Sequence, residues 1–222
     1  SAHADPHVAR YCMTRGTGRQ SRTDVSPLME EARVGEPGHP SRIGFRLMAL
    51  SLALTRRGPI LEERLRVSGV GPGQIVLDYA CGPGYYTIPA ARLVGPAGHV
   101  FALDIQPAAV AMVNARAAAA GVTNITTITS DRGTSLPDGT VDLVLLYDAI
   151  AGIADKRGVL AEIDRVLKPN GDLSVWVEHR DPALTVPLIT DHSRFVLRQR
   201  QGDVLRFGRD EPVVSEPPAQ GA

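Results

Sequence analysis

Hydrophobic and polar residues follow two alternating periods along the middle of the chain. Short apolar runs bounded by Gly, Pro, Asn or Asp predict buried strands, and segments with apolar residues three and four apart predict helices. The predicted strands are residues 74–79, 99–104, 124–129, 141–147 and 172–178, and the predicted helices between them are 85–94, 107–120 and 159–167. This alternation is typical of βαβ units. It indicates an α/β fold, doubly wound, with a mainly parallel sheet covered by helices on both faces.

The two ends of the chain follow different patterns. Residues 1–40 are rich in Gly, Arg, Ser and Pro and have no clear period, which is typical of a flexible arm or of a lid that orders over a ligand. Beyond residue 178, a short helical stretch precedes two close strand-like runs that we expect to form a hairpin at the sheet edge. The remaining predicted elements are helices at 41–57, from Pro59 and at 184–189, and strands at 194–200 and 203–207. We expect an N-terminal arm or cap over residues 1–57, a ligand-binding domain over 58–210 and a flexible tail over 211–222.

Composition excludes several classes of protein. The 222 residues carry 24 basic and 24 acidic side chains, so global charge gives no case for binding nucleic acid or an anionic membrane. Cys12 and Cys81 are the only cysteines, which excludes a disulfide framework and a zinc site built on several thiolates. The longest apolar run, residues 47–54, is too short to span a bilayer. We expect a cytoplasmic protein with no membrane span and no bound metal.

The stretch VLDYACGPGYY (residues 76–86) carries the clearest chemical signal. Its glycines follow a predicted strand and open a predicted helix, the context in which such a turn holds a ligand. Asp104 stands at the end of the next predicted strand, 20 residues beyond Gly84. An acidic residue at that place binds ribose hydroxyls in nucleoside-binding α/β folds. A dinucleotide would satisfy these features as well as a simple nucleoside.

Charge argues against the dinucleotide. No Lys, Arg or His occurs within residues 67–91, and Asp78 lies immediately before the turn. A pyrophosphate beside that carboxylate would cost on the order of several kcal/mol at the intermediate dielectric of a cleft. S-adenosylmethionine has a nucleoside, a sulfonium, an α-ammonium and no phosphate, so its charge suits the turn.

Five segments together resemble the successive motifs of class I S-adenosylmethionine-dependent methyltransferases. They are LDYACGPGYY, ALDIQP, the turn at Asp131, VDLVLLYDAI and LAEIDRVLKPNGDLSV. The resemblance covers roughly residues 61–177 and is closest to the group that contains the ubiquinone/menaquinone C-methyltransferases. It implies a Rossmann-like, seven-stranded sheet whose last strand is antiparallel, in agreement with the terminal hairpin.

The resemblance also implies a role for each matching residue. Asp78 and the backbone of Ala80, Cys81, Gly82 and Gly84 would meet the methionine part of S-adenosylmethionine; Asp104 would hold the ribose; Ile105, Asp131 and Arg132 would surround the adenine; and Tyr147 would line the methyl-transfer site. Two departures from the family pattern stand out. Ala80 occupies a position that is often glycine, which we take as a mild change. Ala151 and Gly152 stand where the family often has histidines, so a ready-made base is missing there.

The expected function is methyl transfer by in-line displacement to a small-molecule acceptor, with Tyr147 and His179 as candidate catalytic residues. His179 follows the fifth predicted strand, at the end where parallel sheets place their active sites. Cys81 is interpreted as a small buried residue and not as a nucleophile. A non-catalytic S-adenosylmethionine-binding subunit, a nicotinamide-dependent oxidoreductase and an aminopropyl transferase are the alternatives. The sequence leaves open the acceptor, the atom methylated and whether the protein forms a homodimer.

Overall fold

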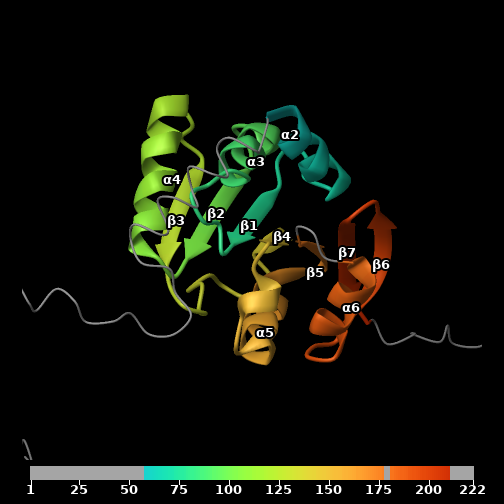
Figure 1. Cartoon of the computed structure of the whole chain (residues 1–222). Helices are drawn as coiled ribbons and strands as arrows, with labels where there is room; N and C mark the ends of the chain where they lie inside the picture. The colour runs from blue at the N-terminus through green and yellow to red at the C-terminus, as the bar shows by residue number, and fades with distance from the viewer. Residues whose placement is uncertain (1–57, 178–180, 211–222) are drawn as a thin grey trace, which may run out of the picture. The chain divides into compact units, whose positions relative to one another are not determined.

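A computed structural model describes residues 58–177 and 181–210 of the chain (Figure 1). The predicted arm with its helix at 41–57, the candidate base His179 and the C-terminal tail lie outside the described residues. The division into arm, domain and tail therefore stays a prediction.

The described residues form one seven-stranded sheet in the order β3-β2-β1-β4-β5-β7-β6. Strands β1 to β5 pair in parallel, and β7 pairs antiparallel with both β5 and β6. The strands are β1 (Ile75–Tyr79), β2 (His99–Asp104), β3 (Ile125–Thr129), β4 (Val141–Tyr147), β5 (Leu167–Trp176), β6 (Phe195–Gln201) and β7 (Val204–Arg209). The predicted doubly wound sheet with a C-terminal hairpin is confirmed.

Helices cover both faces of the sheet. They are α2 (Gly58–Val67), α3 (Thr87–Val94), α4 (Pro107–Ala120), α5 (Lys156–Val166) and α6 (Pro182–Thr190), with a short 3-10 helix η2 (Ile150–Gly152). Side chains of α2 and α3 form one core cluster with Leu145 of β4, and side chains of α5 and α6 form another with Leu146. Neighbouring residues of β4 thus face opposite layers, as the alternation of side chains in a strand requires.

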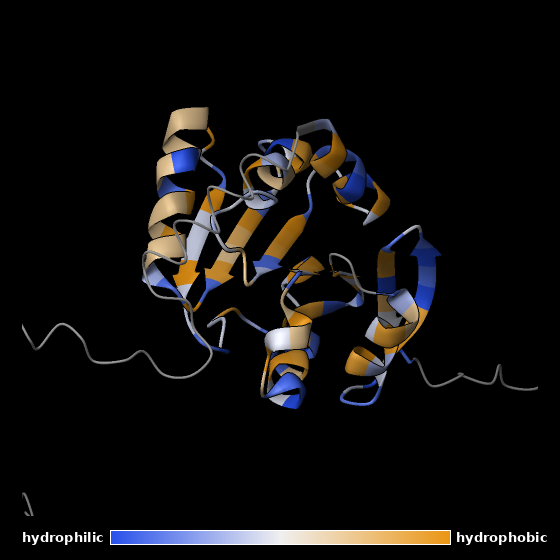
Figure 2. Ribbon diagram, viewed as in Figure 1, coloured by the Kyte–Doolittle hydropathy of each residue, from blue (hydrophilic) through white to orange (hydrophobic). Residues whose placement is uncertain are grey.

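The sheet's interior and its outer edge differ in polarity. The central strands are apolar along most of their length, whereas much of β6 is hydrophilic (Figure 2). All residues of β6 after Phe195 are exposed, and Arg198 and Arg200 lie among them. Charged side chains on an edge strand discourage pairing with another chain.

Several predicted boundaries are wrong; helix α5, for example, begins at Lys156 and not at residue 159. Helix α3 begins at Thr87, because the residues before it belong to the glycine turn, and Tyr85 is therefore not helical. Strand β5 begins at Leu167, which pairs with Val141 across an irregularity, so residues 168–171 belong to a strand instead of a helix stop. The limits predicted for α4 agree with the structure, with Pro107 at its first turn and Gly121 left-handed at its end.

The topology has one switch point. The chain leaves β1 for β2 on one side of it and later enters β4 on the other side. In open α/β sheets, ligands bind outside the carboxyl ends of the strands at such a point. We call the edge at which β1 to β5 end the carboxyl edge.

Candidate active site

The glycine turn (residues 80–84) leaves β1 at the carboxyl edge with a strained backbone. The φ angles are 61° at Ala80, 53° at Gly82 and 81° at Gly84, all in the left-handed region. A Cβ on Gly84 would also lie 2.9 Å from Val113 Cγ2 of α4. Glycine is therefore required at position 84. The interpretation of Ala80 as a mild change is wrong, because a left-handed alanine costs roughly 1–2 kcal/mol.

Asp104 ties this turn to the start of α4. One of its carboxylate oxygens accepts from the Gly82 amide and the other from the Gln106 amide, each at 2.8 Å. Each carboxylate oxygen has a second lone pair, so the group retains capacity for hydroxyl donors. The ribose-binding role of Asp104 stays a prediction, and the structure adds a second role in shaping the turn.

Asp78 lies beneath the turn and not on an open surface. It is 3% exposed, and its Oδ2 accepts from the hydroxyl of Thr87, the first residue of α3, at 2.6 Å. Burial, followed by the charges of Asp78 and Asp104, raises the pKa of the Cys81 thiol far above its ordinary value. The thiol therefore stays protonated, which supports its interpretation as a buried residue and not a nucleophile.

The predicted adenine-binding residues lie next to Asp104. Ile105 is 43% exposed, an unusual position for a large apolar side chain. Asp131 follows β3, whose last residue is in register with Asp104, and it is exposed. The Tyr79 hydroxyl donates to the Arg132 carbonyl at 2.9 Å and so fixes this loop to the end of β1. The roles of these residues toward adenine stay predictions.

The Arg132 side chain has a partner within the protein. Its guanidinium lies 3.0 Å from a carboxylate oxygen of Asp155, the N-cap of α5. Both side chains are exposed, so the pair is weak and a ligand could compete for the guanidinium.

The structure places the Tyr147 side chain in the core, and its catalytic and donor-binding roles stay predictions. Its side chain is only 6% exposed, and its hydroxyl bonds to the hydroxyls of Ser68 and Ser174. The ring packs edge-on against Tyr86 with centroids 4.7 Å apart, in the layer covered by α2 and α3. Burial raises the pKa of Tyr147 above its ordinary value. We therefore interpret Tyr147 as a core residue.

Sequence reasoning missed three residues that shape the carboxyl edge. Tyr79 and Thr87 act as described above. Asp148, the first residue after β4, has a left-handed φ of 55° and is exposed. The signal for Asp148 was its place directly after a buried strand, and for Thr87 its place at the start of a helix. The bond of Tyr79 joins residues far apart in the sequence and left no local signal.

Arginines also approach the tyrosines that follow the glycine turn. The guanidinium of Arg116 on α4 lies 4.0 Å from the Tyr85 ring centroid. That of Arg64 on α2 lies 3.7 Å from the Trp176 ring and donates to the Tyr86 hydroxyl. Residues 67–91 contain no basic side chain, and the sequence argument from that range did not consider Arg64 and Arg116, which come from other helices. Both are engaged with aromatic side chains.

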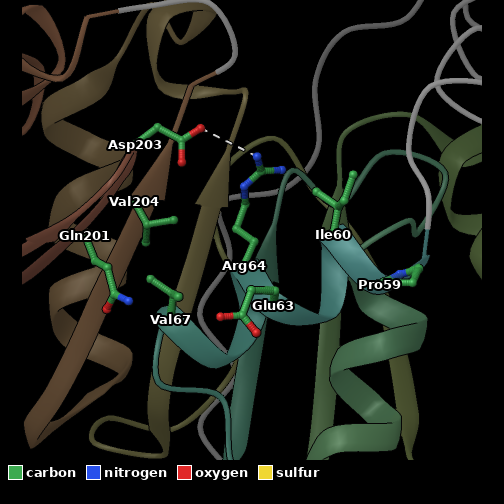
Figure 3. A pocket seen from close by; sticks show the side chains of 8 residues that line it. All are labelled: Pro59, Ile60, Glu63, Arg64, Val67, Gln201, Asp203 and Val204. Carbon is green, nitrogen blue, oxygen red and sulfur yellow. Dashed lines mark ion pairs between the residues drawn. The ribbon is translucent and has the colours of Figure 1, made fainter.

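A groove of about 370 Å³ lies between α2 and the β6–β7 turn (Figure 3). Its lining residues are Pro59, Ile60, Glu63, Arg64, Val67, Gln201, Asp203 and Val204. Arg64 and Asp203 form an ion pair across it at 3.5 Å. None of the residues predicted to bind the donor lines this groove, so it is separate from the glycine turn.

The described residues contain neither a metal-binding cluster nor a membrane-spanning helix. No group of three or more His, Cys, Asp or Glu side chains in residues 58–177 and 181–210 could hold a metal ion. Within the same ranges, no helix has the length and apolar character needed to cross a membrane.

The fold and the site together define a nucleoside-binding, doubly wound α/β protein. A glycine turn after β1, an acidic residue ending β2 and a switch point between β1 and β4 are the features of that class. Residues 71–196 match the family described as "Methyltransferase domain". The chain belongs to this family, the class I S-adenosylmethionine-dependent methyltransferases, and the predicted cofactor is the one that the family uses.

Individual relatives agree with this assignment. The chain is 38% identical over 116 residues to ubiquinone/menaquinone biosynthesis C-methyltransferase UbiE of Hydrogenovibrio crunogenus. The aligned segment covers 51% of this chain and 46% of the relative. The chain spans about half the length of the curated relatives it matches. Among solved structures, a SAM-dependent methyltransferase from Aquifex aeolicus superposes with a TM-score of 0.61, at 23% identity over 66% of this chain and 88% of that one.

The fold alone does not select the reaction. The [4+2]-cyclase SpnF superposes with a TM-score of 0.55, at 18% identity over 64% of this chain and 57% of that protein. Function must therefore be argued from the site.

Proposed function

We propose that this protein transfers a methyl group from S-adenosylmethionine to a small-molecule acceptor, and that the acceptor is a reduced quinone or a similar electron-rich hydroxylated ring. The observation that carries the donor part is the pair of carboxylates at the glycine turn: Asp78 lies buried beneath it, and Asp104 accepts from the Gly82 amide. A sulfonium and an ammonium are stabilised there, whereas a pyrophosphate is repelled.

The residues present fit the donor. Left-handed glycines at 82 and 84 bring bare backbone to the ligand, and Asp104 retains lone pairs for ribose hydroxyls. The exposed Ile105 offers an apolar surface for the adenine face. When bound, S-adenosylmethionine supplies an electrophilic methyl group on a good leaving group. The protein then has to orient the acceptor in line with that group and keep water out.

The acceptor class rests on the relatives. The names of the matched UbiE proteins and of a demethylmenaquinone methyltransferase from Bacillus cytotoxicus, 31% identical over 125 residues, describe methylation of quinone precursors. A hydroxylated ring of this kind becomes a carbon nucleophile when it loses its O–H proton, which creates a need for a base.

Two experiments test the proposal. Titration calorimetry with the full chain should show binding of S-adenosylmethionine and of its demethylated product S-adenosylhomocysteine, with no binding of NAD. Incubation with isotopically labelled donor and 1,4-naphthohydroquinone, followed by mass spectrometry, should then show the labelled methyl group in the acceptor. An extract of cellular metabolites serves as a second, unbiased acceptor mixture.

Each alternative predicts a different result. Tight NAD binding would support the oxidoreductase and contradict the proposed donor. Donor binding with no labelled product from any acceptor would support the non-catalytic subunit instead. Label in a metabolite but not in the naphthohydroquinone would keep methyl transfer and refute the quinol class.

A further inference from the structure

Asp148 lies at the carboxyl edge, at the end of β4, beside the end of β1 from which the glycine turn leaves. It is the first residue after β4, and β4 pairs directly with β1, with Leu145 in register with Asp78. Adjacent strands lie about 4.8 Å apart, so the end of β4 is one strand spacing from the end of β1. Asp148 and Ala80 are thus neighbouring strand exits, and both have left-handed φ angles, 55° and 61°.

The predicted orientation of the donor brings its reacting methyl group toward the end of β4. Asp104 ends β2 and Asp131 follows β3, and both strands lie on the side of β1 away from β4. If ribose and adenine lie there, the remaining part of the donor extends across β1 toward β4. An acceptor that approaches the methyl group from this side then lies next to the end of β4, where Asp148 stands.

Three other polar side chains near this edge form hydrogen bonds within the protein. Asp78 is buried against Thr87, and Asp104 accepts two backbone amides. The Tyr147 hydroxyl is buried with two serines. Asp148 lies at the same edge, and its side chain is exposed to solvent.

The backbone holds Asp148 in this place. Its amide donates to the Trp176 carbonyl of β5 at 2.8 Å, which extends the β4–β5 ladder by one residue, and η2 begins two residues later. A left-handed non-glycine residue costs energy, and such strain is concentrated where the surrounding structure enforces a functional geometry. Asparagine tolerates the same conformation almost as well as aspartate. The charge of residue 148 can therefore be removed without changing the preference of its backbone.

We propose that the Asp148 carboxylate is the catalytic base on the acceptor side. This inference rests on the proposed methyl transfer. The carboxylate takes the proton of the acceptor's hydroxyl group, and the acceptor's freed electron pair forms the new bond to the methyl carbon. The sulfur–methyl bond breaks, its electron pair stays on sulfur as the neutral thioether, and Asp148 returns its proton to water. The methylated ring carbon then loses its hydrogen as a proton and the ring oxygen regains one, which restores the hydroxylated ring. No oxidant or further reactant is required.

Acceptor acidity provides the sharpest test. A base contributes typically 10²–10⁴-fold when the acceptor holds its proton firmly, and little when the acceptor is already ionised. The assay uses the full chain with labelled S-adenosylmethionine and ring-substituted 1,4-naphthohydroquinones of graded acidity. For Asp148→Asn we expect about a 100-fold loss of kcat with the least acidic acceptor and only a few-fold loss with the most acidic one. S-adenosylhomocysteine affinity should stay within threefold of the parent protein.

Two control variants separate charge from folding. Asp148→Gly relaxes the left-handed backbone and also lacks the base, so it should fold at least as stably as the parent and show the same loss of kcat. Asp191→Asn removes an exposed carboxylate at the end of α6 and should leave kcat unchanged. Parent-like turnover of Asp148→Asn, or a loss independent of acceptor acidity, would overturn the inference while methyl transfer stands. Absence of turnover by the parent protein with every acceptor would overturn the proposed function, and the inference with it.

Discussion

Glu162 provides the most quantitative test of how the adenine-side loop is held. Its Oε1 accepts from the Thr134 amide at 2.8 Å and from the Thr134 hydroxyl at 2.6 Å, and both of its oxygens accept from Arg165. Thr134 lies three residues after Asp131, so this carboxylate anchors the loop to α5. We expect Glu162→Gln to destabilise the protein, because the new amide group would face the Arg165 guanidinium with a donor.

The magnitude follows from the pKa. Hydrogen bonds from Arg165, followed by those from Thr134, lower the pKa of Glu162 from 4.5 to about 2. At 1.36 kcal/mol per unit, this shift corresponds to at most about 3 kcal/mol. Because solvent screens the open side of the pair, we expect a loss of roughly 1–2 kcal/mol at pH 7.

The pH dependence has a definite sign. A carboxyl group whose pKa is lower in the folded state stabilises that state above its unfolded pKa, and this contribution disappears as the pH falls. The difference between Glu162→Gln and the parent protein should therefore be full at pH 7 and shrink from about pH 4.5 toward pH 2. Urea denaturation at a series of pH values measures it.

Asp138 provides a matched control. It pairs with the same Arg165, but its side chain is 80% exposed, whereas that of Glu162 is 14% exposed. Asp138→Asn should change stability by no more than about 0.5 kcal/mol. Equal losses for the two variants at pH 7, or a Glu162→Gln difference that stays constant down to pH 2.5, would refute the reasoning.

Two further predictions concern the site itself. Asp104→Asn should weaken S-adenosylhomocysteine binding at least tenfold by calorimetry and also lower the free energy of unfolding by roughly 1–3 kcal/mol, because its new amide group faces a backbone donor; unaltered affinity would place the ribose elsewhere. Tyr147→Phe should cost about 1 kcal/mol of stability through lost bonds to Ser68 and Ser174 and leave kcat unchanged. A fall in kcat at parent-like stability would instead support Tyr147 as a catalytic residue.

Local sequence alone determined most of the fold. The central strands and helices alternate in period, and a strand followed by glycines and a helix is a short-range signal, so the order of elements could be predicted. Asp78 and Asp104 were found for the same reason, because each stands at a strand end that the pattern marks. The terminal hairpin was marked by its Gly202 turn, and the structure places β7 against β5 as the resemblance implied.

The tertiary structure alone decided the surroundings of the predicted site residues. Strand β4 is apolar and buried from Leu143 to Tyr147, so no polar alternation indicates which layer Tyr147 enters. The bonds of Tyr79 to the Arg132 carbonyl and of Glu162 to Thr134 join residues 53 and 28 positions apart. Arg116 reaches the Tyr85 ring from another helix. The left-handed φ angles of Ala80 and Asp148 were likewise not predictable from the sequence, since neither residue type requires that conformation. The local pattern therefore predicted the carboxyl edge of the sheet, and contacts between distant segments determine which side chains lie there and what they bond to.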